Sequence, residues 1–290
     1  MNNKKFLAID IGGTAIKYGV FNSDFEPVEL FSIPTKLSRE ELSKQVEEII
    51  ENHLFIDGVA IATAGVVDEF GTIKYANSTI KNYTGFEFEK FVKQVLNKNN
   101  IDVPVKVIND ANSAAYAEHV FDKNYNNSLT LTLGTGVGAG IILNGKLLLG
   151  NNGTAGEVGA IRFFNSKETI DNELSWSRFY INVKETLQIN NPDIWQLYQN
   201  NDFIKQKLDK YLDKLANLLT ILSYTISVEV IYLGGGFSNC DPNILRMLNE
   251  RFKQNYNFYN INLIEIKYAA NKNNAGMLGV LHLLINKHFK

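Results

Sequence analysis

The hydrophobic residues of this 290-residue chain recur in two segments that share one pattern. Residues 7–20 (LAIDIGGTAIKYGV) and 131–143 (LTLGTGVGAGIIL) each contain an apolar run, a glycine-rich turn with a threonine, and a second apolar run. Short apolar runs separated by turn residues are typical of buried strands. We therefore predict that each half of the chain opens with a β-hairpin and that the two halves repeat one structural unit.

Polar residues that favour turns follow both segments. Asn22-Ser23-Asp24 follows the first segment, and Asn144-Gly145 follows the second. The Asn-Gly pair favours a tight type I′ turn, because both central residues of that turn need a positive φ. We expect the chain to reverse direction at both places.

Helical and strand patterns alternate along the rest of the chain. Ser38 and Glu41 form a capping box at the start of one helix, and apolar residues recur at helical spacing between Phe88 and Leu96. The expected elements are a helix from 38, a strand at 57–62, a helix at 88–96, a strand at 103–108, a helix at 111–120, a helix from about 203 to 227, a strand at 228–233 and a closing helix at 275–286. This alternation predicts an α/β fold with at least partly parallel sheets.

Composition narrows the functional classes. Lysine and arginine total 29 against 31 aspartate and glutamate residues, a net charge of −2, which argues against a general nucleic-acid or anionic-membrane binder. Neither a signal peptide nor a membrane-spanning run is recognisable, so we expect a soluble, cytoplasmic protein. One cysteine and four scattered histidines leave neither an internal disulfide nor a cysteine-based zinc site.

Three glycine-rich turns come directly after apolar strands, where backbone N–H groups can approach a phosphate. They are residues 10–14 (DIGGT), 134–138 (GTGVG) and 234–236 (GGG). None fits the Walker A pattern or the dinucleotide-binding fingerprint. Any one of them alone could serve only to reverse the chain, but three in a duplicated α/β chain favour a phosphate-bearing ligand.

In this order and spacing, the motifs resemble the ROK family of sugar kinases and sugar-responsive repressors, within the actin-like ATPase superfamily. The resemblance covers nearly the whole chain and also rests on residues 109–112 (NDAN) and 156–159 (GEVG). Residues 63–68 (TAGVVD), 79–83 (TIKNY) and 273–279 (NNAGMLG) are most similar to bacterial N-acetylmannosamine kinases and, less closely, to β-glucoside kinases.

The resemblance implies two actin-like (ribonuclease H-like) α/β domains, residues 1–112 and 113–290, with an active-site cleft between them. The closing helix, about 275–286, could pack on the first domain. The implied activity is transfer of the γ-phosphoryl group of ATP to a hexose hydroxyl, expected to be the 6-hydroxyl. N-acetylmannosamine is the favoured substrate, followed by glucose or a β-glucoside. The alternative is an inactive sugar-sensing protein with the same fold. A repressor needs a winged helix-turn-helix ahead of this body, and only nine residues precede Asp10.

Two aspartates carry the expected chemistry. Phosphoryl transfer to a sugar needs a base at the accepting hydroxyl, donors around the phosphates and a magnesium ion. Asp110 follows a buried strand and precedes a helix. On the residues alone it could equally be the helix N-cap, and the resemblance assigns it as the catalytic base. Asp10 ends the first strand and could be a turn residue, and the resemblance places it where it would hold magnesium through water.

The resemblance also implies the residues that contact each substrate. The ATP-binding residues would be Asp10, Gly12, Gly13, Thr14, Gly134, Thr135, Gly136, Gly234, Gly235 and Gly236. The sugar-binding residues would be Gly65, Asn109, Asp110, Glu157 and Glu173. Glu173 is included because Asn172-Glu173-x-Ser175 resembles a segment that supplies a sugar-binding glutamate in zinc-less members. On the residues alone, Glu157 could be a solvated loop carboxylate and Glu173 an exposed residue at the start of a helix.

The chain departs from the family pattern at the zinc site. Most members place a histidine just after the Gly-Glu-x-Gly segment and follow it with a cysteine cluster that holds a structural zinc. Here that position is Ala160, and residues 161–176 contain no cysteine or histidine. We therefore expect ATP and Mg²⁺ but no zinc. The resemblance further implies a homodimer that takes a small-molecule sugar and ATP. From the balanced charge we expect no nucleic-acid or membrane partner.

Overall fold

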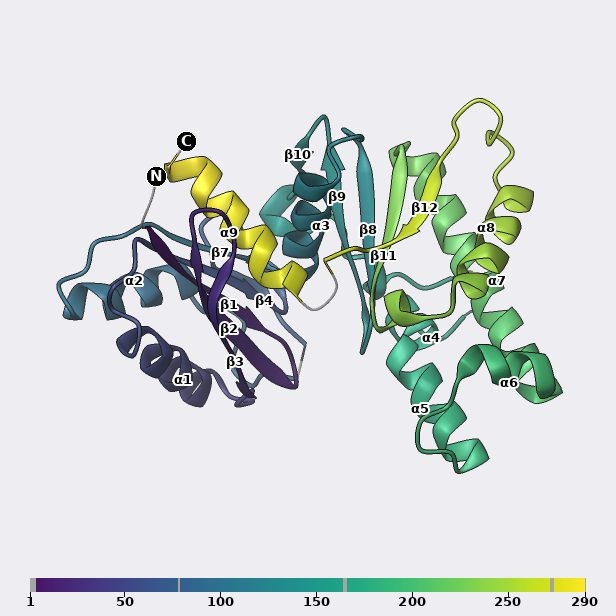
Figure 1. Ribbon diagram of the computed structural model, residues 1–290, viewed down its shortest axis with the longest axis horizontal. Helices are drawn as coiled ribbons and strands as arrows, with labels where there is room; N and C mark the ends of the chain where they lie inside the picture. Colours follow the sequence, from purple (N-terminus) through teal and green to yellow (C-terminus); the bar gives the residue numbers. More distant parts are fainter. Residues whose placement is uncertain (1–3, 78, 164–165, 272–273, 290) are drawn as a thin grey trace. The chain divides into compact units, whose positions relative to one another are not determined.

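The computed structural model describes residues 4–77, 79–163, 166–271 and 274–289 (Figure 1). By its internal contacts the chain forms two compact units. The first unit comprises Met1–Phe121, Leu147–Gly156 and Asn273–Lys290, and the second comprises Asp122–Lys146 and Glu157–Lys272. Each unit has its own sheet and its own hydrophobic core.

The first unit is built on a five-stranded sheet with the order β3-β2-β1-β4-β7. β1 pairs antiparallel with β2, and β2 pairs antiparallel with β3, whereas β1, β4 and β7 are parallel. The bounds are β1 (Lys5–Ile11), β2 (Ala15–Asn22), β3 (Pro27–Pro34), β4 (Gly58–Thr63) and β7 (Val105–Asn109), with β5 (Val66–Val67) and β6 (Ile73–Tyr75) pairing separately. The carboxyl ends of three parallel strands therefore share one edge of this sheet.

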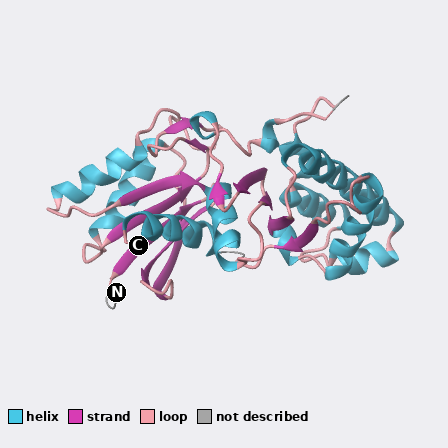
Figure 2. Ribbon diagram, turned by 90° about the horizontal axis from the view of Figure 1, so that it is seen from above, coloured by secondary structure: helices cyan, strands magenta, loops and turns pink. Residues whose placement is uncertain are grey.

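Helices cover both faces of this sheet, and Figure 2 shows strands with helices on either side. Leu7 and Ile9 of β1 pack in the core with α1 and α2, while Phe6 and Ala8 pack against α9. Side chains alternate between faces along a strand, so Asp10 lies on the α9 face with Ala8. The bounds are α1 (Arg39–Glu51), α2 (Phe88–Lys98), α3 (Asp110–Phe121) and α9 (Ala275–His288). α3 packs against α9 through small side chains such as Ala117.

The second unit has a sheet with the order β10-β9-β8-β11-β12, in which β8 pairs antiparallel with β9 and parallel with β11, and β11 pairs parallel with β12. Its strands are β8 (Ser128–Leu133), β9 (Val137–Leu143), β10 (Lys146–Leu147), β11 (Val230–Gly235) and β12 (Glu265–Tyr268). Its helices are α4 (Ile170–Leu174), α5 (Trp176–Leu187), α6 (Ile194–Asn200), α7 (Asp202–Ile226) and α8 (Pro242–Asn255). Buried residues of all five helices join one core with the apolar face of β8 and β11.

The structure confirms the prediction of a repeated unit. Both sheets begin with an antiparallel hairpin and continue with two parallel strands in the same spatial order. Asn144 and Gly145 adopt φ values of 52° and 71°, as a type I′ turn requires. The turn after Asn22, between β2 and β3, is longer. The Asn22 side chain stabilises it by accepting hydrogen bonds from the backbone N–H groups of Asp24 and Glu26.

Helices that are marked by a capping residue in the sequence begin where the sequence predicts, as α1 shows. The Ser38 hydroxyl accepts a hydrogen bond from the backbone N–H of Glu41 at 3.3 Å and caps α1. β3 was not predicted because nearly all of its residues are exposed, which removes the alternation that marks a half-buried strand. The short elements, α5 and α8 were not predicted either. The short elements include the 3₁₀ turns η1 (Asn151–Gly153), η2 (Val158–Ala160) and η3 (Gly236–Asn239).

The contacts assign α3 and α9 to the first unit, and α9 packs on its sheet through Met277, Val280 and Leu284. The residue range of α3 therefore lies with the first sheet, although the expected domain boundary falls at residues 112 and 113. The division into domains 1–112 and 113–290 stays a prediction.

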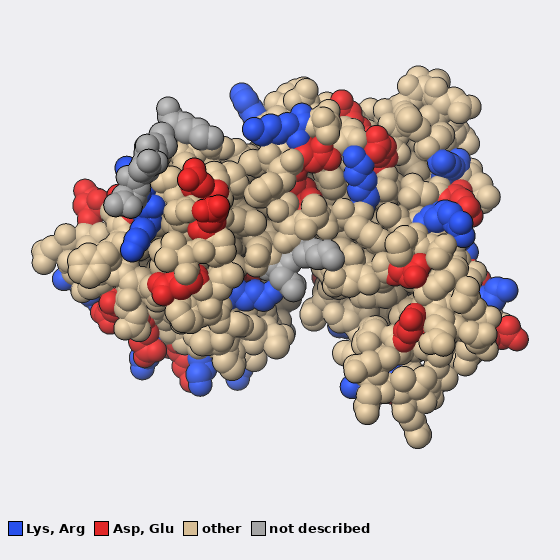
Figure 3. Space-filling view, in the orientation of Figure 1, with Lys and Arg blue, Asp and Glu red and all other residues tan. Residues whose placement is uncertain are grey.

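None of the helices in the described ranges is both long and apolar enough to cross a membrane. On the face drawn in Figure 3, basic and acidic side chains are interspersed over both units. No broad basic area is visible on that face, in keeping with the nearly balanced charge of the sequence.

Candidate functional site

Two carboxylates lie at the carboxyl edge of the first sheet. Asp10 of β1 pairs in register with Ala62 of β4, which in turn pairs with Ile108 of β7, and Asp110 follows two residues later. Asp10, Ala62 and Ile108 are in step across the three parallel strands, and Ala62 and Ile108 belong to the α9 face. The topology therefore brings Asp10 and Asp110, each expected at the end of a strand, to one edge of the sheet.

Burial of these two carboxyl groups changes their acidity. It raises the pKa of Asp10 to about 7. The negative charge of Asp110 reinforces this effect, and the positive charge of Lys17 opposes it. It also raises the pKa of Asp110 to about 6, against hydrogen bonds that favour the ionised form. Two partly buried acids with too little positive charge around them form a site that a cation would stabilise.

Asn109 and Asp110 have different tasks in the first turn of α3. The Asn109 Oδ1 atom accepts a hydrogen bond from the backbone N–H of Asn112 at 2.9 Å, so Asn109 is the side chain that caps the helix. Asp110 is the first helical residue and accepts hydrogen bonds at Oδ1 from Asn109 Nδ2 at 3.1 Å and from the Ala111 N–H at 2.9 Å. Its other oxygen, Oδ2, receives neither. The capping alternative considered for Asp110 thus belongs to its neighbour.

The amide of Asn109 is almost fully engaged. Its Nδ2 atom donates both to Asp110 Oδ1 and to the carbonyl oxygen of Gly65 at 2.9 Å. An amide nitrogen has two hydrogens, so no donor remains for a sugar hydroxyl. The geometry gives Asn109 and Gly65 a role in holding Asp110, and direct contact of either with a sugar stays a prediction.

Thr63 and Tyr83 form a buried pair beside this edge that the sequence did not suggest. Thr63 ends β4 opposite Asn109, and its Oγ1 atom lies 2.7 Å from the hydroxyl of Tyr83. Burial raises the pKa of Tyr83, and the charge of Asp110 raises it further, so the phenol stays neutral. Both residues lie in the segments that carry the family resemblance, which is the one signal that pointed to them.

The first glycine-rich turn is exposed at its tip. Gly12 is held by hydrogen bonds from its N–H to the Ala15 carbonyl and from the Thr35 hydroxyl to its own carbonyl at 2.7 Å. Gly13 and Thr14 are exposed to solvent. A ligand could therefore reach the tip of this turn while its base stays fixed.

The other two glycine-rich turns lie side by side at the carboxyl edge of the second sheet. Gly235 pairs in register with Leu133, the residue just before the turn at 134–136. Gly235 has a φ of 68°, and a Cβ there would lie 2.5 Å from the Leu133 carbonyl oxygen, so this close approach of two strands needs glycine. Thr135 and Gly236 are exposed. Pairing thus brings together the two ATP-binding segments predicted for this half of the chain.

A segment around α4 and α5 fixes the turn at 134–136. Ser175 Oγ donates to the carbonyl oxygen of Gly134 at 3.0 Å, and Asp171 Oδ1 accepts from the Val137 N–H at 2.6 Å. The Asp171 carboxylate also lies against Gly136 and Gly159, where added side chains would collide with it. Asp171 was not predicted, although it lies only two residues from Glu173.

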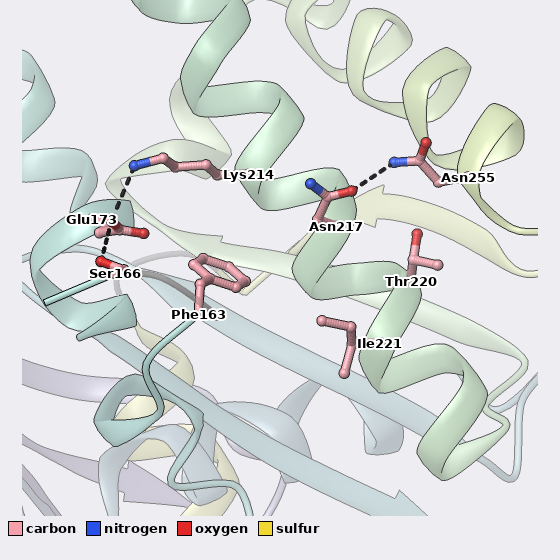
Figure 4. A pocket seen from close by; sticks show the side chains of 8 residues that line it. All are labelled: Phe163, Ser166, Glu173, Lys214, Asn217, Thr220, Ile221 and Asn255. Carbon is pink, nitrogen blue, oxygen red and sulfur yellow. Dashed lines mark hydrogen bonds and ion pairs between the residues drawn. The ribbon is translucent and has the colours of Figure 1, made fainter. Parts of the chain in front are cut away.

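Glu173, unlike Asp171, lies in a pocket away from the turn at 134–136. It lines a pocket of about 680 Å³ in the second unit, together with Phe163, Ser166, Lys214, Asn217, Thr220, Ile221 and Asn255 (Figure 4). Its Oε1 atom accepts from Ser166 Oγ at 2.8 Å and pairs with Lys214 Nζ at 3.1 Å. Glu157 is exposed just before η2. Sugar binding by Glu157 and Glu173 stays a prediction, and the structure adds Lys214 as the charge partner of Glu173.

Asp10 and Asp110, the acid pair, suit a magnesium ion that is bound together with a nucleotide better than a metal ion held by protein ligands alone. Within the described ranges, no group of three or more histidine, cysteine, aspartate or glutamate side chains could hold a metal ion. Magnesium bound with a nucleotide usually takes one or two carboxylates, phosphate oxygens and water. No hydrogen bond among the described residues reaches the Asp10 carboxylate, so its oxygens can serve such an ion.

Sequence comparison finds named relatives along most of the chain. An uncharacterised protein of Clostridium perfringens is 35% identical over 292 residues, which cover 96% of either protein. A β-glucoside kinase of Listeria monocytogenes is 26% identical and covers 98% of this chain and 99% of its own. An N-acetylmannosamine kinase of Vibrio cholerae is 27% identical and covers 83% of this chain and 87% of its own.

Solved structures share the fold. A ROK family protein of Streptococcus pneumoniae in complex with sucrose superimposes with a TM-score of 0.81 at 23% identity and covers 98% of both chains. A ROK family glucokinase of Streptomyces griseus in complex with glucose and AMPPNP gives 0.80 at 21% identity and covers 97% of this chain and 99% of that one. These likenesses show the two-domain, actin-like α/β fold.

The sequence model of the ROK family matches residues 6–287, which include the acid pair and all three glycine-rich turns. Together with the repeated sheets and the relatives above, this match means that the chain belongs to the ROK family.

Proposed function

We propose that this protein is an ATP-dependent sugar kinase that transfers the γ-phosphoryl group of ATP to a hexose hydroxyl. The observation that carries the proposal is the Asp110 carboxylate, which is fixed at the sheet edge through Oδ1 while Asn109 caps the helix. The kinase names of the relatives from Listeria monocytogenes and Vibrio cholerae support the same class of reaction.

Asp110 would act as the general base. As the phosphoryl group moves to the sugar oxygen, the Asp110 carboxylate accepts the hydroxyl proton, and Asn109 and the Ala111 N–H hold it in position. Burial raises the pKa of Asp110 to about 6, so the group is mostly ionised at neutral pH and yet basic enough to take a proton. A base with a pKa near the working pH is the most effective one.

ATP would be held by the glycine-rich turns of both units, 12–14 and 134–136, with 234–236 near the nucleoside. Their exposed tips present backbone N–H groups, and Asp10 would hold the magnesium ion through water. When bound, magnesium spreads the charge that develops on the phosphoryl group. The proposed ATP-binding residues thus come from both units.

The proposed sugar is N-acetylmannosamine, followed by glucose or a β-glucoside, phosphorylated at the 6-hydroxyl. This order follows the similarity of the motifs and the names of the relatives. Gly65, Glu157 and Glu173 are proposed sugar contacts, with Asn109 acting through Asp110. Of these, Glu173 also contacts Ser166 and Lys214.

A coupled assay of ADP release with a panel of hexoses, N-acetylhexosamines and β-glucosides tests the proposal. We expect turnover with at least one sugar, abolished by removal of Mg²⁺. A protein that binds a sugar tightly in calorimetry but releases no ADP with any member of the panel would instead be a sugar sensor, and the kinase proposal would be wrong.

The family resemblance also supports a cytoplasmic homodimer without zinc. Light scattering on purified protein should give twice the chain mass of 32.7 kDa. Elemental analysis of protein purified without chelator should show far less than one zinc per chain. Stoichiometric zinc would contradict our interpretation of residues 160–176.

A further inference from the structure

Helix α9 closes over Asp10 at a glycine. Gly276 is the second residue of α9, and its Cα faces the carboxylate at the end of β1. A Cβ at this position would lie 2.5 Å from Asp10 Cγ, 2.6 Å from Oδ2 and 2.8 Å from Oδ1. No side chain fits at residue 276 while Asp10 keeps its place.

The same turn of α9 is tied to the helix that begins with Asp110. Ser113 of α3 donates a hydrogen bond from its hydroxyl to the carbonyl oxygen of Gly276 at 2.5 Å. One turn later, Gly279 lies directly on the carbonyl of Ser113. The two glycines let α9 approach both elements that bear the acid pair.

Packing, rather than hydrogen bonding, holds the Asp10 side chain. None of the hydrogen bonds that the described residues make reaches its carboxylate, and the neighbouring Asp110 charge repels it. An aspartate has three staggered χ1 positions, and a wall on one side selects among them. The backbone of α9 at Gly276 supplies that wall.

We propose that Gly276 is a positioning residue for the nucleotide site, whose missing side chain lets Asp10 point where it meets the magnesium of ATP. This inference rests on the proposed function, because it assigns the role of Asp10 within that site. A methyl group at residue 276 would move the carboxylate more easily than the helix, since the atoms it meets are the end of a short side chain. Groups of a binding or catalytic site must be held within about 0.5 Å of their productive geometry.

The experiment compares two single-methyl additions against the same helix. Gly276→Ala adds its methyl at Asp10, whereas Gly58→Ala in β4 adds one 2.9 Å from Leu284 Cδ2 of α9, far along the helix from Gly276. Calorimetry would measure ATP affinity with Mg²⁺ and with chelator, and circular dichroism would confirm folding.

We expect Gly276→Ala to weaken MgATP binding by about tenfold or more, the usual effect of displacing a group that orients a metal ligand. Binding of metal-free ATP should change less than twofold, and Gly58→Ala should bind both forms as the wild type does. Wild-type MgATP affinity in Gly276→Ala, or equal weakening in the two variants, would overturn the inference.

Ser113→Ala keeps the inference testable if Gly276→Ala does not fold. It removes only the hydrogen bond to the Gly276 carbonyl and adds no atoms. MgATP binding should weaken roughly fivefold, the equivalent of one hydrogen bond, and unchanged binding would count against the proposal. A wild-type protein that binds MgATP but transfers no phosphoryl group would contradict the proposed kinase activity, and these variants would still decide the role of Gly276.

Discussion

At the scale of single residues, Asn109 and Asp110 show how one helix start can serve both folding and chemistry. The side-chain oxygen of Asn109 accepts a hydrogen bond from the Asn112 N–H, and its side-chain nitrogen donates to Gly65 and Asp110. The cap is therefore independent of the proposed base. A substitution at Asp110 can test chemistry without removing the helix cap.

Asp110→Asn keeps the shape of the side chain and removes its basicity. We expect kcat to fall by at least ~10²-fold, the lower range for a positioned general base. Sugar affinity should change much less, because an amide still forms a hydrogen bond with a hydroxyl. Steady-state kinetics, with binding measured separately, check this, and a near-normal kcat would mean that another group is the base.

Replacing Asn109 separates helix capping from the charge placed beside Asp110. Asn109→Asp keeps an oxygen for the helix cap but loses both amide donors and places a second negative charge beside Asp110. The added charge should raise the pKa of Asp110. The pH at which kcat/KM increases should therefore be higher than in the wild type by about one unit or more. Asn109→Ser also caps and adds no charge, so its pH profile should move less. Identical profiles for the two variants would refute this electrostatic account.

The pH dependence of stability isolates Asp10. Its pKa rises from 3.8 to about 7 on folding, so the folded protein binds this proton more tightly than the unfolded chain does. Unfolding free energy should therefore fall as pH increases through that interval. In Asp10→Asn this contribution is absent, so the variant should gain stability relative to the wild type between pH 5 and 8. Urea denaturation at pH 5 and pH 8 measures the unfolding free energy of both proteins. A difference between variant and wild type that is the same at both pH values would contradict the raised pKa of Asp10.

At the scale of elements, glycines at the end of the second sheet differ in what they must do. Gly235 needs a positive φ and touches the backbone of Leu133, whereas a Cβ at Gly134 would meet nothing within 4 Å. Gly235→Ala should lower the unfolding free energy by about 1–3 kcal/mol through backbone strain. Gly134→Ala should leave it within about 0.5 kcal/mol. Chemical denaturation of both variants tests the contrast, which equal losses would disprove.

The elements that the sequence predicted are those whose signals are local. The Ser38 cap, the Asn144-Gly145 turn and the amphipathic helix α2 depend on residues within a few positions of one another. The contact of Gly276 with Asp10 joins residues more than 260 positions apart, so no pattern in the sequence reveals it. The same holds for the Asp171 contact with Val137.

The candidate site was predictable to the same degree. The glycine-rich turns and both aspartates stand at strand ends, as predicted, and the sheet order brings those strand ends together. The neighbours that orient them could not be predicted. Tyr83 reaches Thr63, and Glu173 pairs with Lys214, only because the fold brings distant segments together.

At the scale of the whole molecule, the repeat explains why glycine-rich turns occur in both units. Each sheet places a glycine-rich hairpin turn after its first strand, β1 or β8, and parallel strands beside it. The second unit inserts α4 to α7 between its hairpin and β11, and this insertion carries Asp171 and Glu173. The sheets supply a common framework, and the insertion supplies residues peculiar to one unit.

The exposed strand β3 bears on how the protein behaves in a crowded solution. It is the outermost strand of its sheet and displays Val28, Leu30 and Phe31 to solvent. Such an edge invites strand addition by another molecule, the first step towards aggregation. Proline stands at both ends of β3, at Pro27 and Pro34, and has no N–H to offer an incoming strand. The two prolines shorten the edge that can pair with an incoming strand, so we expect them to limit self-association.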